Sequence, residues 1–343
     1  MSLLETEIRE QPQAIARALQ GTAGPIAEVV RGVAARGPLE HVVIAARGTS
    51  DNAARYGQYL IGARLGLPVA LAAPSLVTMY GAPVVPRGAH TLVVAISQSG
   101  QSEDVVGVLA SARAAGAPTV AVTNAPDSPL AAEADVVLDL DVGPERSVAA
   151  TKTYTASLAV VAALVLALAG DADRSLVLRE RGPQALAQAV DLAFAAVGAL
   201  DAHASAPHVV AVGRGYNYAT AMEIALKVRE LTATVAEGFS PADLLHGPIA
   251  AVGPGTPALI VAPPGRVLES VLGAADALAR RGAVPLVIGD RPDAALRLPV
   301  GLPEWLTPLA AVVPGQVLAL RWAQVGGHPV DAPPGLRKVT VTR

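Results

Sequence analysis

The sequence predicts an α/β protein in which helices flank parallel sheets, and it predicts that this unit occurs twice. Short apolar runs alternate with segments of helical spacing, and strands that are apolar on both sides belong to sheets covered on both faces. The strand–glycine–helix pattern that begins at His41 recurs at His208, and the one that begins at Thr91 recurs at Pro257. Such a long period indicates a repeated domain. Apolar residues make up 52% of the chain and aromatic residues 3%, so small aliphatic side chains must fill the core.

The elements of the first copy follow in order along the chain. The first 35 residues are expected to be helical, because apolar side chains recur at helical spacing until Gly37 and Pro38 end the segment. Apolar runs then predict strands at Val42–Ala46, Pro68–Ala72, Thr91–Ile96, Thr119–Thr123 and Val136–Leu138. Helices are expected between them at Ser50–Leu65, Ser102–Ala115 and Pro129–Ala132. The apolar stretch Ala156–Ala169 predicts a buried helix, because it is shorter than the ~20 residues that span a membrane.

These patterns divide the chain into an N-terminal helical segment (1–35), a first domain (36–170), a second domain (185–330) and a C-terminal tail (331–343). The connector lies around Ala169–Gln184. The polar loop of the first copy, at 97–100, has no counterpart in the second copy, where Ala-Pro-Pro-Gly stands at 262–265. The two copies are therefore expected to have different tasks.

Composition and charge exclude several classes of protein. The formal net charge is −3, with 26 Lys and Arg against 29 Asp and Glu, which argues against a nucleic-acid binder. The chain holds no cysteine, so disulfides, thiolate metal sites and a cysteine nucleophile are excluded. The first residues show no basic segment followed by an apolar run, so we expect no signal peptide and a cytoplasmic protein.

The loop Ser97–Ser102, Ser-Gln-Ser-Gly-Gln-Ser, lies between a predicted buried strand and a predicted helix. Ligands of open α/β sheets bind at this position, and the free N–H groups of a helix start suit a phosphate. The loop matches neither nucleotide-binding glycine pattern, and its neutral donors favour a phosphomonoester. The other interpretation is an N-capping loop with surface serines.

A second loop of this kind, Gly48–Asn52, follows the strand at Val42–Ala46 and opens the next helix. Two such loops of one sheet are expected to converge on one ligand. For this loop, however, an ordinary helix cap by Ser50 or Asp51 is the stronger interpretation.

Three charged residues, Glu223, Lys227 and Glu230, share one face of a predicted helix. Glu223 and Lys227 are expected to form an ordinary Glu-to-Lys helix pair worth ~0.3–0.5 kcal/mol. Glu230 ends an apolar helix, where partial loss of solvent suits acid–base chemistry. His246 stands in a Gly- and Pro-flanked loop and Lys338 near the C-terminus. By themselves, a lone histidine is more often structural and a terminal lysine solvated.

Six segments of the chain resemble, in order, the tandem sugar-isomerase (SIS) domains of glucosamine-6-phosphate synthase and of stand-alone SIS-type glucosamine-6-phosphate deaminases. They read ARGTSDNAA, AISQSGQSED, GPERSVAATKTYTASLAVV, ALKVREL, LLHGP and LRKVTV. The resemblance extends from about residue 7 to residue 343 and is specific, because the motifs keep their order and spacing. It implies two flavodoxin-like SIS domains, each a parallel sheet flanked by helices, with the active site formed in a homodimer.

The resemblance also implies which residues bind the substrate. A sugar phosphate is the expected ligand, and neither nucleic acid nor a membrane is an expected partner. The phosphate-binding residues would be Ser97, Gln98, Ser99 and Ser102. The residues at the sugar itself would be Thr49, Ser50, Val148 and Ala149, the last two through backbone groups.

Four residues carry the catalytic roles that the resemblance implies. Glu230 would move a proton between C1 and C2, and His246 would open the ring from the neighbouring subunit. Lys338 would meet the open-chain carbonyl, with Lys227 as its helix-borne neighbour, and the tail 331–343 would close on the site. One positioned carboxylate can perform the proton transfer, so no metal and no redox cofactor is expected.

Two departures from the family pattern shape the functional prediction. Ala150 replaces a serine of the family, which removes one hydroxyl contact to the sugar. The synthase hydrolyses glutamine with a terminal cysteine in an N-terminal domain, and this chain has neither. We therefore expect the reverse reaction, from glucosamine 6-phosphate to fructose 6-phosphate and ammonia.

Three alternatives remain open at this point. The first is an isomerizing glutamine–fructose-6-phosphate transaminase-like enzyme that lacks its glutaminase domain and takes up ammonia. The second is a deglycase or isomerase for another phosphosugar. The third is a non-catalytic phosphosugar sensor. Such a module need not keep the acid–base residues, whereas this chain has them all.

Overall fold

The computed structural model of the protein describes residues 1–85 and 90–338. Contacts divide these residues into two compact units, which we name after their sheets. The β1–β5 unit comprises Gln13–Glu145 and Lys152–Arg181, and the β6–β10 unit comprises Met1–Pro12, Arg146–Thr151 and Gly182–Lys338. The part of the predicted tail from residue 339 onward lies outside the described residues.

A five-stranded sheet forms the centre of the β1–β5 unit, with parallel pairing in the order β2-β1-β3-β4-β5. Its strands are β1 (His41–Ala46), β2 (Val69–Leu71), β3 (Thr91–Ile96), β4 (Thr119–Thr123) and β5 (Val136–Asp139). All five predicted strands are confirmed to within one residue at either end. Uninterrupted apolar runs mark such strands because both faces are covered, and β3 is buried along its whole length.

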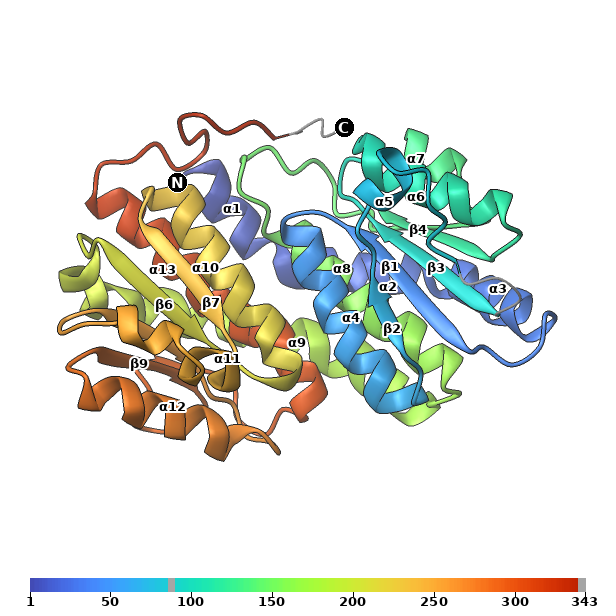
Figure 1. Cartoon of the computed structure of the whole chain (residues 1–343). Helices are drawn as coiled ribbons and strands as arrows, with labels where there is room; N and C mark the ends of the chain where they lie inside the picture. The colour runs from blue at the N-terminus through green and yellow to red at the C-terminus, as the bar shows by residue number, and fades with distance from the viewer. Residues whose placement is uncertain (86–89, 339–343) are drawn as a thin grey trace. The chain divides into compact units, whose positions relative to one another are not determined.

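Helices cover both faces of this sheet (Figure 1). On one face α4 (Thr49–Leu65) packs against α8 (Lys152–Leu168). On the other face α6 (Glu103–Ala114) joins apolar residues of β1, β3 and β4 in one core. The remaining helices of the unit are α3 (Ala23–Ala34), α5 (Ser75–Thr78) and α7 (Pro129–Ala132), together with most of α2 (Gln11–Gly21).

The register of β1 against β3 brings the carboxyl ends of both strands to the same edge of the sheet. His41 pairs with Thr91, and Ala46 pairs with Ile96. The chain continues from β1 into α4 and from β3 into α6, which cover opposite faces. Adjacent strands whose connections run to opposite faces leave a crevice between the connections, and this is where open α/β sheets bind ligands.

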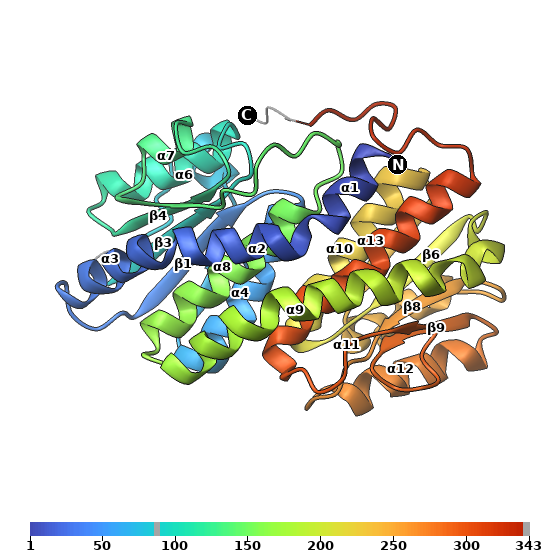
Figure 2. The ribbon, with the colours of Figure 1, turned by 180° about the vertical axis from the view of Figure 1, so that it is seen from behind.

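The β6–β10 unit repeats this strand order, as β10-β9-β8-β6-β7. Its strands are β6 (His208–Val212), β7 (Val235–Phe239), β8 (Pro257–Val261), β9 (Val284–Gly289) and β10 (Leu296–Arg297). Its helices are α10 (Tyr218–Thr232), α11 (Pro241–Leu245), α12 (Leu268–Arg280) and α13 (Thr307–Val325), with 3-10 turns at Val197–His203, Gly215–Asn217, Pro248–Ala251 and Glu304–Leu306. Figure 2 shows α10 and α13 together on one side of this sheet and α12 on the other. Helix α9 (Ala172–Ala196) occupies most of the predicted connector and contributes to both units.

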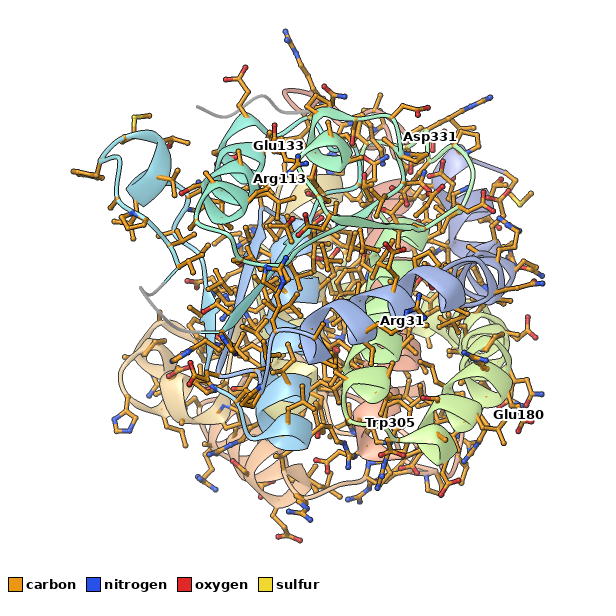
Figure 3. The ribbon with its side chains drawn as sticks, turned by 90° about the vertical axis from the view of Figure 1, so that its right-hand side faces the viewer. Arg31, Arg113, Glu133, Glu180, Trp305 and Asp331 are labelled. Atoms are coloured by element: carbon orange, nitrogen blue, oxygen red, sulfur yellow. The ribbon has the colours of Figure 1, made fainter. Side chains whose placement is uncertain are left out.

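The first helix, α1 (Leu3–Arg9), belongs to the β6–β10 unit because it packs against α13. Leu4 and Ile8 are fully buried in this contact. The carboxylate of Asp331 accepts hydrogen bonds from the N–H groups of Leu3 at 3.0 Å and Leu4 at 2.9 Å. Figure 3 shows Asp331 beside the first turn of α1. The 35 residues predicted as one helical segment thus form three helices, and the first and third belong to different units.

Two helical stretches of the described residues are long and apolar enough to pass for membrane spans. The stretch Glu304–Val325 is 94% buried inside the fold, which identifies α13 as a core helix. The stretch Ala172–His203 is 39% buried. The apolar helix α8 is shorter than both, as the sequence predicts.

Candidate functional site

The loop after β3, Ser97–Ser102, is held in shape by its own hydrogen bonds. The hydroxyl oxygen of the buried Ser97 accepts a hydrogen bond from the N–H of Gly100 at 3.2 Å, and that of Ser99 accepts one from the main chain two residues on at 3.3 Å. Gly100 has φ +62°, and a Cβ atom there would lie 2.0 Å from the hydroxyl oxygen of Ser128. Only glycine fits this position, so the fold itself shapes the loop.

Ser102 stands at the N-cap position of α6 but makes no capping hydrogen bond with its side chain. The interpretation of Ser102 as an ordinary cap is therefore wrong. Ser128, by contrast, caps its helix with its side chain: its hydroxyl oxygen accepts a hydrogen bond from the N–H of Ala131 at the start of α7. In the first turn of α6 the N–H of Val105 donates to Oδ1 of Asp104 at 2.9 Å, and the start of a 12-residue helix is the kind of position where phosphates bind.

An ion pair links the two loops of the β1–β5 unit. Arg47, directly after β1, places its Nε 2.7 Å from Oδ2 of Asp104 in the first turn of α6. Asp104 is 2% exposed, and the guanidinium group offsets its charge at the helix start. This pair was not predicted, although an arginine directly after a strand and an acidic first turn are both visible in the sequence.

The loop after β1 differs from the ordinary cap that the sequence favours. Helix α4 begins at Thr49 with Gly48 as its N-cap, at φ +55°. Ser50 and Asp51 therefore lie within the first turn, and neither is the cap. Burial raises the pKa of the Asp51 carboxyl, while the positive charges of Arg55 and Arg47 act in the opposite direction.

Helix α10 carries Glu223, Lys227 and Glu230 on one face, and two of these three side chains are almost completely buried. Glu223 is 0% and Lys227 1% exposed, and the side chain of Glu230 is 23% exposed. Nζ of Lys227 lies 3.4 Å from Oε1 of Glu223 and also pairs with Oε2 of Glu230. The predicted helix pair of Glu223 and Lys227 is therefore confirmed, but it is buried rather than solvated, because α10 packs against α13 and the sheet.

Glu230 lies in the last turn of α10, three residues before Ala233. The helix ends there with Ala233 in the left-handed conformation at φ +55°. The carbonyl groups at a helix C-terminus disfavour a carboxylate, and the ammonium group of Lys227 offsets this effect. Glu230 is thus a charge-paired carboxylate that still reaches solvent, which suits a general acid–base group.

His246 and Lys338 lie elsewhere in the β6–β10 unit. His246 is exposed and ends α11, and its N–H donates to the carbonyls of Ala242 and Asp243. Gly247 follows at φ +143°, so the chain turns sharply after the histidine. Lys338 is half-buried and is the last residue of the described chain.

The segment Arg146–Thr151 contains the backbone groups predicted to face the sugar. The N–H of Val148 donates to the carbonyl of Asp331 at 3.0 Å, and the carbonyl of Ala149 accepts from the hydroxyl of Ser147 at 3.0 Å. The N–H of Val148 and the carbonyl of Ala149 therefore already form hydrogen bonds within the protein. The carbonyl of Val148 and the N–H of the buried Ala149 have no hydrogen-bond partner among residues 1–85 and 90–338.

The predicted residues fall into two sets, one in each unit. The β1–β5 unit holds Thr49, Ser50, Ser97, Gln98, Ser99 and Ser102. The β6–β10 unit holds Val148, Ala149, Lys227, Glu230, His246 and Lys338. Nowhere in the described parts of the chain do three or more His, Asp or Glu side chains form a group that could hold a metal ion.

Sequence comparison identifies the family. The family model "SIS domain" matches residues 39–167 and 204–297, more than half of the chain. The chain belongs to the SIS domain family. Its curated relatives include glutamine–fructose-6-phosphate aminotransferases [isomerizing] from Pyrococcus horikoshii, 33% identical over 98% of this chain, and from Gloeobacter violaceus, 35% identical over 98%. The chain spans 57% and 58% of the length of these two relatives.

Solved structures share the fold of this SIS protein. A proposed phosphosugar isomerase from Silicibacter pomeroyi DSS-3 is 33% identical, with a TM-score of 0.83 over 96% of this chain and 99% of its own. The C-terminal domain of glucosamine-fructose-6-phosphate aminotransferase from Francisella tularensis is 24% identical, with a TM-score of 0.85 over 96% and 98%. A glucosamine-6-phosphate deaminase from Thermotoga maritima is 21% identical, with a TM-score of 0.83 over 99% and 100%. The predicted fold class, two flavodoxin-like SIS domains, is confirmed.

Two buried carboxylates of this SIS protein were missed in the sequence. Glu145 is 6% exposed and accepts hydrogen bonds from the N–H and hydroxyl of Thr153 at 3.1 and 2.7 Å, at the start of α8. Glu7 is 4% exposed and lies between Leu4 and Ile8 on the buried face of α1. Helical spacing shows that Glu7 shares a face with apolar residues, and this signal was available.

Proposed function

We propose that this SIS protein converts glucosamine 6-phosphate and water into fructose 6-phosphate and ammonia. The observation that carries the proposal is the buried pair of Glu223 and Lys227 beside the partly exposed Glu230. A carboxylate held by a buried ammonium group, and still open to solvent, suits proton transfer between adjacent carbons. Relatives named as isomerizing aminotransferases and as a glucosamine-6-phosphate deaminase support the choice of substrate.

In the proposed reaction the open-chain sugar is the reacting species. His246 assists ring opening, and Glu230 removes the proton from C2 and delivers a proton to C1. One proton passes from the amine nitrogen to O1, so the aldehyde becomes a hydroxyl group and C2 becomes an imine. Water adds to the imine carbon and ammonia leaves, which produces the C2 ketone. Lys338 interacts with the open-chain carbonyl, and Lys227 holds the position and charge of Glu230.

The proposal assigns the phosphate to the loop after β3. Its hydroxyl groups and the N–H groups at the start of α6 are neutral donors, which suits a phosphomonoester. The residues assigned to the phosphate are Ser97, Gln98, Ser99 and Ser102. Those assigned to the sugar are Thr49, Ser50, Val148 and Ala149.

The direction of the reaction rests on the source of nitrogen. The 343 residues contain no cysteine, so they supply no thiol for hydrolysing glutamine. The glucosamine-6-phosphate deaminase from Thermotoga maritima, which this chain covers along its whole length, supports release of ammonia as the proposed direction. The names of the curated relatives favour a second candidate, the synthesis of glucosamine 6-phosphate from fructose 6-phosphate with ammonia.

The proposal includes a cytoplasmic homodimer in which His246 serves the site of the neighbouring subunit. The exposure of His246, and of the apolar Leu245 beside it at 51%, supports this arrangement. Variants of His246 then offer a direct test. A mixture of His246→Ala and Glu230→Gln proteins should regain activity if the two residues act across an interface.

Binding and turnover measured together test the proposed function. Wild-type protein should bind fructose 6-phosphate in calorimetry and release ammonia from glucosamine 6-phosphate. Glu230→Gln should keep binding and lose turnover by about 10²–10⁴-fold. Glu237→Gln is the matched control, because Glu237 is an exposed carboxylate of the same unit whose partner is His208.

Each other outcome has a definite meaning. Binding by the wild type without turnover in either direction identifies a phosphosugar sensor. Turnover only from fructose 6-phosphate and ammonia identifies the second candidate. Release from another amino sugar phosphate, with none from glucosamine 6-phosphate, identifies a deglycase for that sugar.

A further inference from the structure

Glu7 is a buried carboxylate whose hydrogen bonds all lead to one loop. Its oxygens accept from the N–H groups of Arg146 and Ser147 and from the hydroxyl of Ser147. Within the described residues these are its partners, and none of them is a cationic side chain. A carboxylate that is 4% exposed and held only by neutral donors is expensive to bury. Its partners lie 139 and 140 residues away along the chain, so it fixes a tertiary contact.

The loop held by Glu7 contains the backbone groups that the proposed function assigns to the sugar. The hydroxyl of Ser147 bridges the Glu7 carboxylate and the carbonyl of Ala149, at 3.0 Å from the latter. Val148 donates its N–H to the carbonyl of Asp331, whose carboxylate in turn caps the start of α1. Helix α1 therefore holds the segment at both Ser147 and Val148.

This bonding leaves two main-chain groups of the loop without a hydrogen-bond partner among the residues that the structure describes. They are the carbonyl of Val148 and the N–H of Ala149, a residue that is 1% exposed. Buried N–H groups are nearly always paired with protein, water or ligand. The unpaired N–H therefore points to a ligand group or a bound water at this position.

We propose that Glu7 is a positioning residue for substrate binding. It holds the segment 146–149 so that the carbonyl of Val148 and the N–H of Ala149 face the hydroxyl groups of the sugar. The inference rests on the proposed function, which places the sugar at this segment. Glu7 itself touches neither the substrate nor the groups that move protons, so it acts on binding and leaves the chemical step unchanged.

The substitution Glu7→Gln tests this role with little change in volume. The amide offers one acceptor oxygen and turns an NH₂ group toward N–H donors, so one hydrogen bond to the loop is lost. We expect KM for glucosamine 6-phosphate and Kd for fructose 6-phosphate to rise about tenfold, a change of about 1.4 kcal/mol in binding. The value of kcat should change less than twofold. Glu7→Asp, which keeps a carboxylate on a shorter side chain, should recover part of the affinity.

The control is Gln316→Leu, a buried change on α13 in the same unit. Gln316 is 1% exposed and accepts a hydrogen bond from Gln11 at 2.9 Å. This variant should lower Tm and leave KM and Kd unchanged. If Glu7→Gln lowers Tm as the control does and also leaves KM and Kd at wild-type values, the inference is wrong.

Coupling to Ser147 gives a second, independent readout. Ser147→Ala removes the hydroxyl that bridges Glu7 and Ala149, so it should raise Kd on its own. The double variant that combines Glu7→Gln and Ser147→Ala should have a Kd for fructose 6-phosphate no higher than that of the more weakly binding single variant. Both substitutions break the same bridge, so their effects should not add. Fully additive losses would overturn the inference.

Failure of the proposed function is distinguishable from failure of this inference. If the wild type turns over glucosamine 6-phosphate and Glu7→Gln has unaltered KM and Kd, the proposed function is supported and the positioning role of Glu7 is wrong. If the wild type binds these sugars without turnover, the proposed enzymatic function is wrong. The ratio of Kd between Glu7→Gln and the wild type then still tests the positioning role of Glu7. A wild type that neither binds nor turns over these sugars removes both.

Discussion

Gly100 offers a quantitative test of how the phosphate loop is built, through the variant Gly100→Ala. The new Cβ atom would lie 2.0 Å from Oγ and 2.4 Å from Cβ of Ser128, at a backbone φ of +62°. The left-handed conformation costs a non-glycine residue about 1–2 kcal/mol, and overpacking of this kind costs about 1–3 kcal/mol. The smaller freedom of alanine in the unfolded chain returns about 0.4–1 kcal/mol. The net expected loss is thus about 1–5 kcal/mol.

A matched control separates backbone strain from the steric clash. Gly170 lies in the same unit at φ +64°, and a Cβ there would meet nothing within 4 Å. Gly170→Ala should therefore lose only the strain component, and the difference between the two variants should be about 1–3 kcal/mol. Ser128→Gly removes both close contacts of the new Cβ, so adding it to Gly100→Ala should recover part of that difference.

Urea unfolding of the four proteins measures these differences directly. The account also predicts weaker binding of fructose 6-phosphate by Gly100→Ala and unchanged binding by Gly170→Ala, because only the first change displaces the loop. Equal losses of stability for the two glycine variants, or normal sugar binding by Gly100→Ala, would refute the reasoning.

Three further predictions concern the β6–β10 unit. Lys227→Met should cost about 3–5 kcal/mol in urea unfolding, because it breaks the buried ion pair with Glu223; a loss below about 1 kcal/mol would contradict this, and adding Glu223→Gln should recover part of it. Ala233→Gly should raise stability by about 0.5–1 kcal/mol, since glycine adopts φ +55° without steric cost, and a lower Tm would count against it. A hydrogen bond from Arg321, followed by its charge, lowers the pKa of Asp201, so this pair stabilises the fold above the unfolded value near 3.8 and loses its effect as pH falls through the folded pKa. The Tm difference between wild type and Asp201→Asn should therefore shrink on acidification below pH 3.8, and a difference that grows there would be the contrary result.

The sheet of the β1–β5 unit could be predicted closely because its strands carry their own boundaries. Each is an apolar run bordered by glycine, proline or a polar turn, and burial on both faces leaves little ambiguity about which residues belong to it. The loop Ser97–Ser102 could likewise be placed at a strand end before a helix. The hydrogen bonding of its hydroxyl groups could not be predicted, because the lack of a side-chain capping bond at Ser102 depends on backbone angles.

The acid–base helix shows where local spacing stops being informative. Positions 223, 227 and 230 share one face of α10, but spacing does not tell whether a charged face meets solvent or another helix. Glu223 and Lys227 are buried in the packed unit, where α10 contacts α13 and the sheet, and these contacts join residues far apart in the chain. Helix α1 is a similar case, because its place in the β6–β10 unit depends on packing against α13 and on hydrogen bonds to Asp331, 328 residues from Leu3.

The roles of His246 and Lys338 follow from resemblance and not from geometry. The exposed position of His246 is compatible with service to a second subunit, and mixing variants tests it. These two assignments, the domain bounds and the cytoplasmic location remain predictions.

Isotopic labelling at C2 tests the central claim most directly. Wild-type protein is incubated with glucosamine 6-phosphate deuterated at C2, and ammonia and fructose 6-phosphate are followed together. The account predicts equal molar release of both, a slower rate than with unlabelled substrate, and loss of the deuterium from C2 to C1 or to water, with Glu230→Gln inactive. Absence of ammonia at saturating substrate, or full activity of Glu230→Gln, would contradict it.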